Sequence, residues 1–119
     1  MKRYAVTTLL VAGLGPLVAA APAARAASFT CAVAMKPDET AICGSMALSD
    51  LDVRMATLYG VATKLVAMGE RGVLQDDQRR FLGERAACGA DTACLTTLYQ
   101  ARIAVLDGVI GRIAANGPY

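Results

Sequence analysis

The chain has 119 residues, of which 55% are hydrophobic, and it contains four Cys but no His or Trp. Its 12 basic and ten acidic side chains nearly balance, and the length predicts one small domain. The absence of His excludes every nucleophile, general base and metal site that is built on an imidazole. We therefore expect no enzyme activity, no metal site and no cofactor.

Residues 1–26 have the regions of a secretory signal peptide. Lys2 and Arg3 form a basic start, an apolar stretch follows, and Ala24-Arg25-Ala26 has the small-x-small pattern of a cleavage site. Glycines and a proline interrupt the apolar stretch, which disfavours a retained membrane anchor of about 20 residues. Cleavage would leave residues 27–119 as a single domain with nine basic and ten acidic side chains. That balance gives no basis for binding nucleic acid or an anionic membrane.

The four cysteines predict two disulfides, because export leads to an oxidising compartment and the count is even. Four cysteines allow three pairings, and the spacing favours Cys31 with Cys43 and Cys88 with Cys94. These spacings do not fit the CxxC pairs of zinc or redox sites. No Leu-x-small-Cys pattern precedes Cys31, so we expect no lipid anchor and a periplasmic or extracellular location.

From residue 27 onward the periodicity is helical. Pro37 suits the first turn of a short helix that runs toward Cys43, and acids follow it at the positive helix end. Ser49 is predicted to cap a second helix of about 20 residues, which Gly69 and Gly72 would end. The Glu70-Arg71-Gly72-Val73 segment is then predicted to be an exposed loop.

A third helix is predicted to begin near Leu74 and to end at Gly89, and a fourth to begin after Asp91 or Thr92 and to stop at Asn116. The Cys88–Cys94 bridge would lock these two helices as an αα-hairpin. Apolar residues at helical spacing form three stripes: Leu48, Leu51, Met55, Leu58, Ala62 and Leu65; Leu74, Phe81, Leu82 and Cys88; Leu95, Leu98, Ile103, Leu106, Ile110 and Ile113. The predicted fold is a small all-α, disulfide-stabilised bundle of one short N-terminal helix and three longer helices.

Several polar side chains lie on apolar helix faces or near helix starts, namely Glu39, Asp52, Gln78, Arg85, Tyr99 and Arg102. They could form a ligand-binding pocket or an internal network. We favour the network, because a half-buried Arg must find acceptors. Lys36 and Arg71 are the basic residues expected on loops, where they could contact a partner.

The ordered motifs resemble those of the lysozyme inhibitor LprI-like family, formerly a domain of unknown function. They span residues 28–106 and read Phe29-x-Cys31, Glu39-x-x-Ile42-Cys43, Leu48-Ser49-x-Leu51-Asp52, Leu58-Tyr59, Gln78-x-x-Phe81-x-x-x-Arg85-x-x-Cys88 and Cys94-x4-Tyr99-x-x-Arg102-Ile103-x-x-Leu106. The chain departs from the family at Phe81, where members usually have Trp, and at Ala86, where an acid is frequent. The resemblance implies a helical, extracytoplasmic protein that binds and inhibits a lysozyme.

Two modes of inhibition remain open. Lys36 and Arg71 could face the two carboxylates of a glycosidase cleft, or acids such as Asp76 and Asp77 could meet a basic enzyme surface. The alternative function is a structural or interaction module of the cell envelope that binds another protein. The sequence makes no prediction of the oligomeric state.

Overall fold

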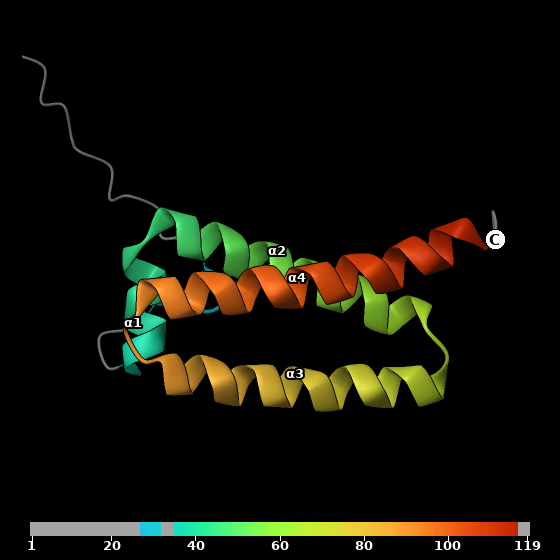
Figure 1. Ribbon diagram of the computed structural model, residues 1–119, viewed down its shortest axis with the longest axis horizontal. Helices are drawn as coiled ribbons and strands as arrows, with labels where there is room; N and C mark the ends of the chain where they lie inside the picture. Colours follow the sequence, from blue (N-terminus) through green and yellow to red (C-terminus); the bar gives the residue numbers. More distant parts are fainter. Residues whose placement is uncertain (1–26, 32–34, 117–119) are drawn as a thin grey trace, which may run out of the picture.

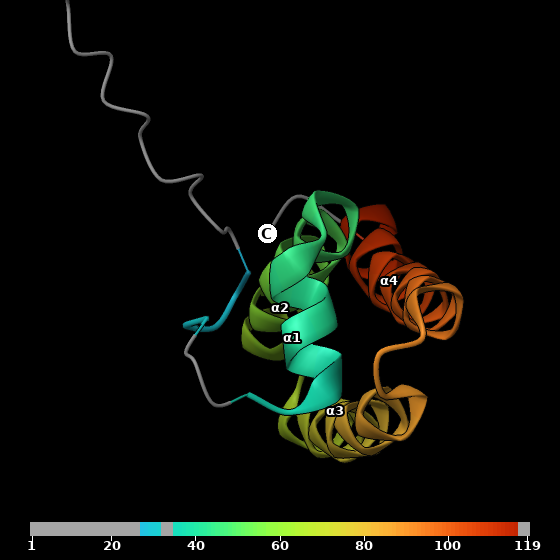
Figure 2. The same ribbon diagram turned by 90° about the vertical axis from the view of Figure 1, so that its left-hand side faces the viewer.

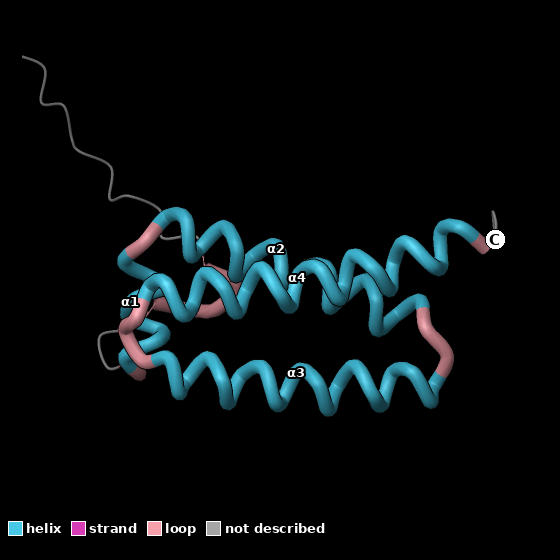
Figure 3. Tube along the Cα trace, viewed as in Figure 1, coloured by secondary structure: helices cyan, strands magenta, loops and turns pink. Residues whose placement is uncertain are grey.

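A computed structural model describes residues 27–31 and 35–116, so the predicted signal peptide over residues 1–26 lies outside the described residues. The described part folds into four helices joined by short loops (Figure 3). They are α1 (Pro37–Gly44), α2 (Met46–Leu65), α3 (Met68–Cys88) and α4 (Thr92–Ala115). The described residues contain no strand, and the predicted all-α bundle of one short and three longer helices is confirmed.

The three long helices run along one axis of the bundle (Figure 1). α2 and α4 run in the same direction and pack most closely, while α3 runs antiparallel to both. α1 lies across the end of the bundle where α2 begins and α3 ends (Figure 2), and it contacts both of those helices. α1 is therefore placed to bring its own polar residues against α3.

The core is built mainly around α4. Its stripe buries Leu95, Tyr99, Ile103 and Leu106, much as the helical spacing predicts. Ile42 of α1, Leu48 and Met55 of α2, and Leu74 and Phe81 of α3 close the core around it. The stripe predictions are wrong at Leu65 and Leu82, whose side chains are 54% and 41% exposed, because α2 ends at Leu65 and α3 buries a narrower face.

Both predicted disulfides form, Cys31–Cys43 with a Cα–Cα distance of 6.0 Å and Cys88–Cys94 with one of 5.7 Å. The second joins the end of α3 to the start of α4 and so confirms the predicted αα-hairpin. Gly89 follows α3 with a φ of +56°, which side-chain-bearing residues rarely adopt. Asp91 then caps α4, since its Oδ1 accepts hydrogen bonds from the backbone N–H groups of Ala93 and Cys94.

The predicted start of the second helix is wrong by one turn. Ser45, not Ser49, is the N-cap of α2, and its hydroxyl accepts a hydrogen bond from the N–H of Leu48. The hydroxyl of Ser49 is buried and donates to the carbonyl of Ile42 at 2.8 Å. Ser49 therefore ties α2 to the end of α1, at a carbonyl that also accepts from the backbone N–H of Ser45.

The predicted link between the second and third helices is also wrong. The chain turns at Val66 and Ala67, which have extended backbone angles, and α3 starts at Met68. Gly69 and Gly72 therefore lie inside the first turns of α3 and do not end α2. Burial of the Val66 side chain in the core fixes the turn there, and this outweighs a glycine penalty of about 1 kcal/mol per residue in a helix.

Of the helices that the structure describes, α4 alone is long and apolar enough to cross a membrane by length and composition. The core helix of a bundle passes the same test. One face of α4 packs into the bundle and buries Leu95, Tyr99 and Ile103, among others. Of the most apolar 18-residue stretch of this helix, 33% is buried inside the bundle.

Candidate functional site

A cluster of charged and polar side chains is buried where α1 crosses the bundle. Arg85 of α3 donates from Nε to Oδ2 of Asp38 in α1 at 2.8 Å, and one of its terminal nitrogens lies 3.9 Å from Oδ1 of Asp52 in α2. Tyr99 of α4 donates its hydroxyl to the same Oδ1 at 2.7 Å. All four helices thus meet at one guanidinium and two carboxylates.

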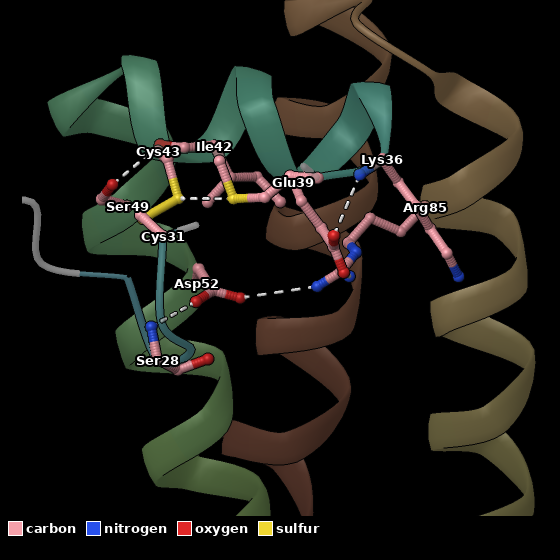
Figure 4. The surroundings of a disulfide bond; sticks show 10 residues. Ser28, Cys31, Lys36, Glu39, Ile42, Cys43, Ser49, Asp52 and Arg85 are labelled. Carbon is pink, nitrogen blue, oxygen red and sulfur yellow. Dashed lines mark hydrogen bonds and ion pairs between the residues drawn. A yellow bond between two sulfur atoms is a disulfide. The ribbon is translucent and has the colours of Figure 1, made fainter. Parts of the chain in front are cut away.

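The N-terminal segment closes this cluster from outside (Figure 4). The backbone N–H of Ser28 donates to Oδ2 of Asp52 at 2.7 Å, and the ring of Phe29 lies 5.4 Å from the guanidinium carbon of Arg85. The Cys31–Cys43 bond fastens the segment to α1. Asp52 therefore accepts hydrogen bonds from Ser28 and Tyr99, and the disulfide holds the first of these two residues in place.

The cluster holds more acid than base. Glu39 lies 3.7 Å from Arg85 and accepts a hydrogen bond from the N–H of Lys36, so three carboxylates surround one guanidinium. Oδ1 of Asp38 is buried and has no hydrogen-bond partner among the described residues. Asp38 is 1% exposed and Asp52 0%, and removing Arg85 would leave both charges buried without compensation.

The environment of the cluster raises the pKa values of both Tyr99 and Arg85. Burial, and then the hydrogen bond to Asp52, raise the pKa of Tyr99 well above its ordinary value, against a smaller opposing effect of Arg85. Burial by itself would lower the pKa of Arg85, but Tyr99 and Asp38 outweigh it and raise the pKa of Arg85 overall. Both groups therefore keep their protons to a higher pH than they would in water.

A second polar group lies further along the bundle between α3 and α4. Arg102 donates to the amide oxygen of Gln78 at 3.1 Å and to the backbone carbonyl of Leu74 at 3.2 Å. Asp77 lies 4.0 Å away. Burial lowers the pKa of Arg102, and the charge of Asp77 opposes this. The guanidinium is thus bound mainly by neutral acceptors.

The six predicted polar residues therefore lie in two groups. Glu39, Asp52, Arg85 and Tyr99 meet at the crossing of α1, and Gln78 and Arg102 meet between α3 and α4. Their polar atoms face one another, as in an internal network. Sequence reasoning missed Asp38, the main acceptor of Arg85. Its position one residue after Pro37 marks it as a first-turn acid, but no local signal indicates that α3 covers it.

The prediction of Arg71 on a loop is wrong. Arg71 lies in the first turn of α3, its Nε is buried, and a terminal nitrogen donates to the carbonyl of Val66 at 3.3 Å. It therefore satisfies a backbone group at the α2–α3 turn. Lys36 does precede a helix on an exposed loop, but α1 and the start of α3 lie at opposite ends of the bundle (Figure 1). The two basic residues cannot act as one loop.

A groove runs along the outer face between α3 and α4. Its larger part has a volume of about 800 Å³ and lies beside the Cys88–Cys94 bond. A smaller part of about 170 Å³ continues toward Phe81 and Arg102. Glu84, Leu98 and Ala101 line both parts, so the two form one continuous hollow. Sequence reasoning did not predict it, because it results from the loose packing of a polar α3 against α4.

No family model, no curated protein and no solved structure matches this chain. The likeness to the lysozyme inhibitor LprI-like family stays a prediction that rests on the motif residues.

Proposed function

We propose that this protein is an exported, non-enzymatic binding protein that inhibits a lysozyme-type glycosidase. The motif resemblance supports the target. The two disulfides are consistent with an oxidising compartment. The observation that carries the proposal is the open groove between α3 and α4, because it offers a partner protein an apolar surface on a disulfide-stabilised scaffold.

The buried polar cluster supports a role for its residues in the scaffold rather than in binding. Tyr99 is 0% exposed and Arg85 8%, and both already donate to carboxylates of the same chain. A partner would have to break those interactions to reach them, which leaves buried charges without partners. The motif residues at these positions are thus better suited to specifying the bundle.

The groove has the composition of a protein-binding surface. Its lining is mostly apolar, with Leu98, Ala101 and the Cys88–Cys94 bond, and the acids Glu84 and Asp91 also line it. Interfaces between proteins commonly combine apolar side chains with a smaller number of polar ones. The groove also lies on two long helices, so it keeps its shape without a mobile loop.

The charge of the groove favours one of the two modes of inhibition. Glu84 and Asp91 line its larger part, where no basic side chain takes part. Two carboxylates line the cleft of a glycosidase, and like charges would oppose placing the groove against them. The proposed contact is therefore with a basic surface of the enzyme outside its catalytic carboxylates.

The test is a lysozyme assay with the exported protein purified with both disulfides intact. The turnover of a peptidoglycan suspension should fall in proportion to added protein. Ala101→Trp fills the groove and should weaken inhibition at least about tenfold, which corresponds to about 1.4 kcal/mol. Ala104→Trp is the matched control, because Ala104 is an exposed residue of α4 that does not line the groove.

Loss of inhibition in Ala101→Trp with an unchanged melting temperature would support the proposal. No inhibition by the wild-type protein at saturating concentration would overturn it. The alternative would then be an interaction module of the cell envelope, which capture of a different envelope protein under oxidising conditions would support.

A further inference from the structure

We infer that the groove between α3 and α4 receives a cationic, amphipathic α-helix on the surface of the partner protein. This inference rests on the proposed function in that the helix belongs to the inhibited enzyme. Glu84, which lines both parts of the groove, selects the charge of that helix.

The dimensions of the groove suit a helix. Its α3 wall extends from Asp77 to Cys88, and its other wall extends from Val105 of α4 back to Asp91, the N-cap of that helix. At a rise of about 1.5 Å per residue the α3 wall is roughly 16 Å long, or about three helical turns. Two antiparallel helices with a hollow between them offer parallel ridges to a third helix, which is the geometry of helix-in-groove recognition.

The side chains of the floor allow close approach. Ala87, Ala93 and Ala101 are small, and Leu98 lies between them. Val105, at the far end, is 51% exposed and adds apolar area. An occupant needs an apolar face of about three turns to cover this strip, since burial of apolar area contributes roughly 25 cal/mol per Å².

The unpaired charge at the groove is negative. Arg80 pairs with Asp77, and Arg102 is held by Gln78 and the carbonyl of Leu74. By contrast, the side chain of Glu84 makes no hydrogen bond or ion pair with any residue in the described ranges. Glu84 lines both parts of the groove, so it lies where the two parts meet.

A helix that lies along this groove therefore brings a Lys or Arg beside its apolar face, opposite Glu84. Asp91, at the disulfide end, offers a second acid to such a helix. An anionic amphipathic helix would place its charge against both acids and would be rejected. Specificity would thus come from the sign of the charge, while affinity would come from the apolar floor.

The experiment measures binding of synthetic peptides to the purified protein, with both disulfides intact, by fluorescence anisotropy. The cationic probe is an amphipathic helix of Leu and Lys, and the matched probe carries Glu in place of every Lys. We expect the cationic peptide to bind at least about tenfold more tightly. Glu84→Lys should remove that preference, whereas Asp50→Lys should not, since Asp50 is exposed on α2 away from the groove and changes the net charge equally.

Equal binding of both peptides, or equal loss of preference in Glu84→Lys and Asp50→Lys, would overturn the inference. The proposed function fails separately. Selective peptide binding without inhibition of a lysozyme would support this groove specificity and reject the glycosidase as target. Inhibition of a lysozyme that the cationic peptide does not compete with would keep the proposed function and reject the groove as receptor.

Discussion

Tyr99 and Asp52 are 47 residues apart in the sequence, and the hydroxyl of Tyr99 donates a hydrogen bond of 2.7 Å to Oδ1 of Asp52 inside the bundle. Phe81 packs edge-on against the Tyr99 ring, with 5.2 Å between the ring centroids. The phenol is thus enclosed by an aromatic ring on one side and directed at a carboxylate on the other. This pair connects the last long helix to the first, and it has a measurable consequence at alkaline pH.

The stability of the protein should fall above about pH 10. Burial and the hydrogen bond to Asp52 raise the pKa of Tyr99 above its ordinary value of 10.0. The folded protein therefore keeps a proton that the unfolded chain releases, so this stabilisation is complete below pH 10 and is lost as the pH rises further. The free energy of unfolding, measured with urea at a series of alkaline pH values, should fall less steeply with pH in Tyr99→Phe than in the wild-type protein. An equal decline in Tyr99→Phe and wild type would contradict this prediction, and Tyr59→Phe controls for the loss of a phenol.

Arg85→Met should destabilise the fold by about 3–5 kcal/mol, because Asp38 and Asp52 lose their buried counter-charge. Arg102→Met should cost less, about 1–3 kcal/mol, because it leaves mainly neutral acceptors without a donor. Arg54→Met is the control, since its ion pair with Asp107 is exposed and exposed pairs contribute at most about 1 kcal/mol.

Urea denaturation ranks the three arginine variants, and the inhibition assay is then run on the folded fraction. Inhibition per folded molecule should be unchanged in Arg85→Met and Arg102→Met. A strong loss of inhibition with an unchanged free energy of unfolding would instead identify these arginines as ligand-binding residues.

Each disulfide should contribute about 2–3 kcal/mol, as expected for closing short loops in the unfolded chain. Non-reducing peptide mapping should recover Cys31 with Cys43 and Cys88 with Cys94. The Cys31→Ser, Cys43→Ser double variant should also speed hydrogen exchange at the Ser28 amide, which the first disulfide holds against Asp52. Unchanged exchange at Ser28 would show that the segment stays bound without the disulfide.

Two glycines of the αα-hairpin should respond to alanine in opposite directions. Gly89→Ala should destabilise the fold by about 1–3 kcal/mol, because the φ of +56° and ψ of −133° suit only glycine. Gly83→Ala should stabilise it by about 1 kcal/mol, because Gly83 lies inside α3 and a Cβ there meets only open space. Thermal unfolding of both variants tests this prediction. A shift of the melting temperature in the same direction in Gly89→Ala and Gly83→Ala would contradict it.

The sequence predicts the elements whose signals are local. Pro37 places the start of α1, Gly89 and Asp91 place the hairpin turn, and the stripe of α4 identifies the helix at the centre of the core. The disulfide pairs follow from their spacing. These features depend on backbone angles, capping and periodicity within a few residues, which the amino-acid types express directly.

The remaining features depend on contacts that are distant in the sequence. The α2–α3 turn lies at Val66 because that side chain enters the core, while the glycines that follow look locally like a helix end. Asp38 has the position of a solvent-exposed first-turn acid, and its burial results from Arg85, 47 residues later. The groove arises from the spacing between two helices, which no local pattern encodes.

The buried cluster also sets the order in which the chain can complete its fold. Asp38 and Asp52 emerge first during synthesis, whereas Arg85 and Tyr99 emerge much later. Burying either carboxylate before its counter-charge arrives is opposed by desolvation of the charge. Burial of Asp38 and Asp52 is therefore favourable only once α3 and α4 supply Arg85 and Tyr99. We expect the crossing of α1 over the bundle to close late in folding, after the helices whose donors its acids need are present.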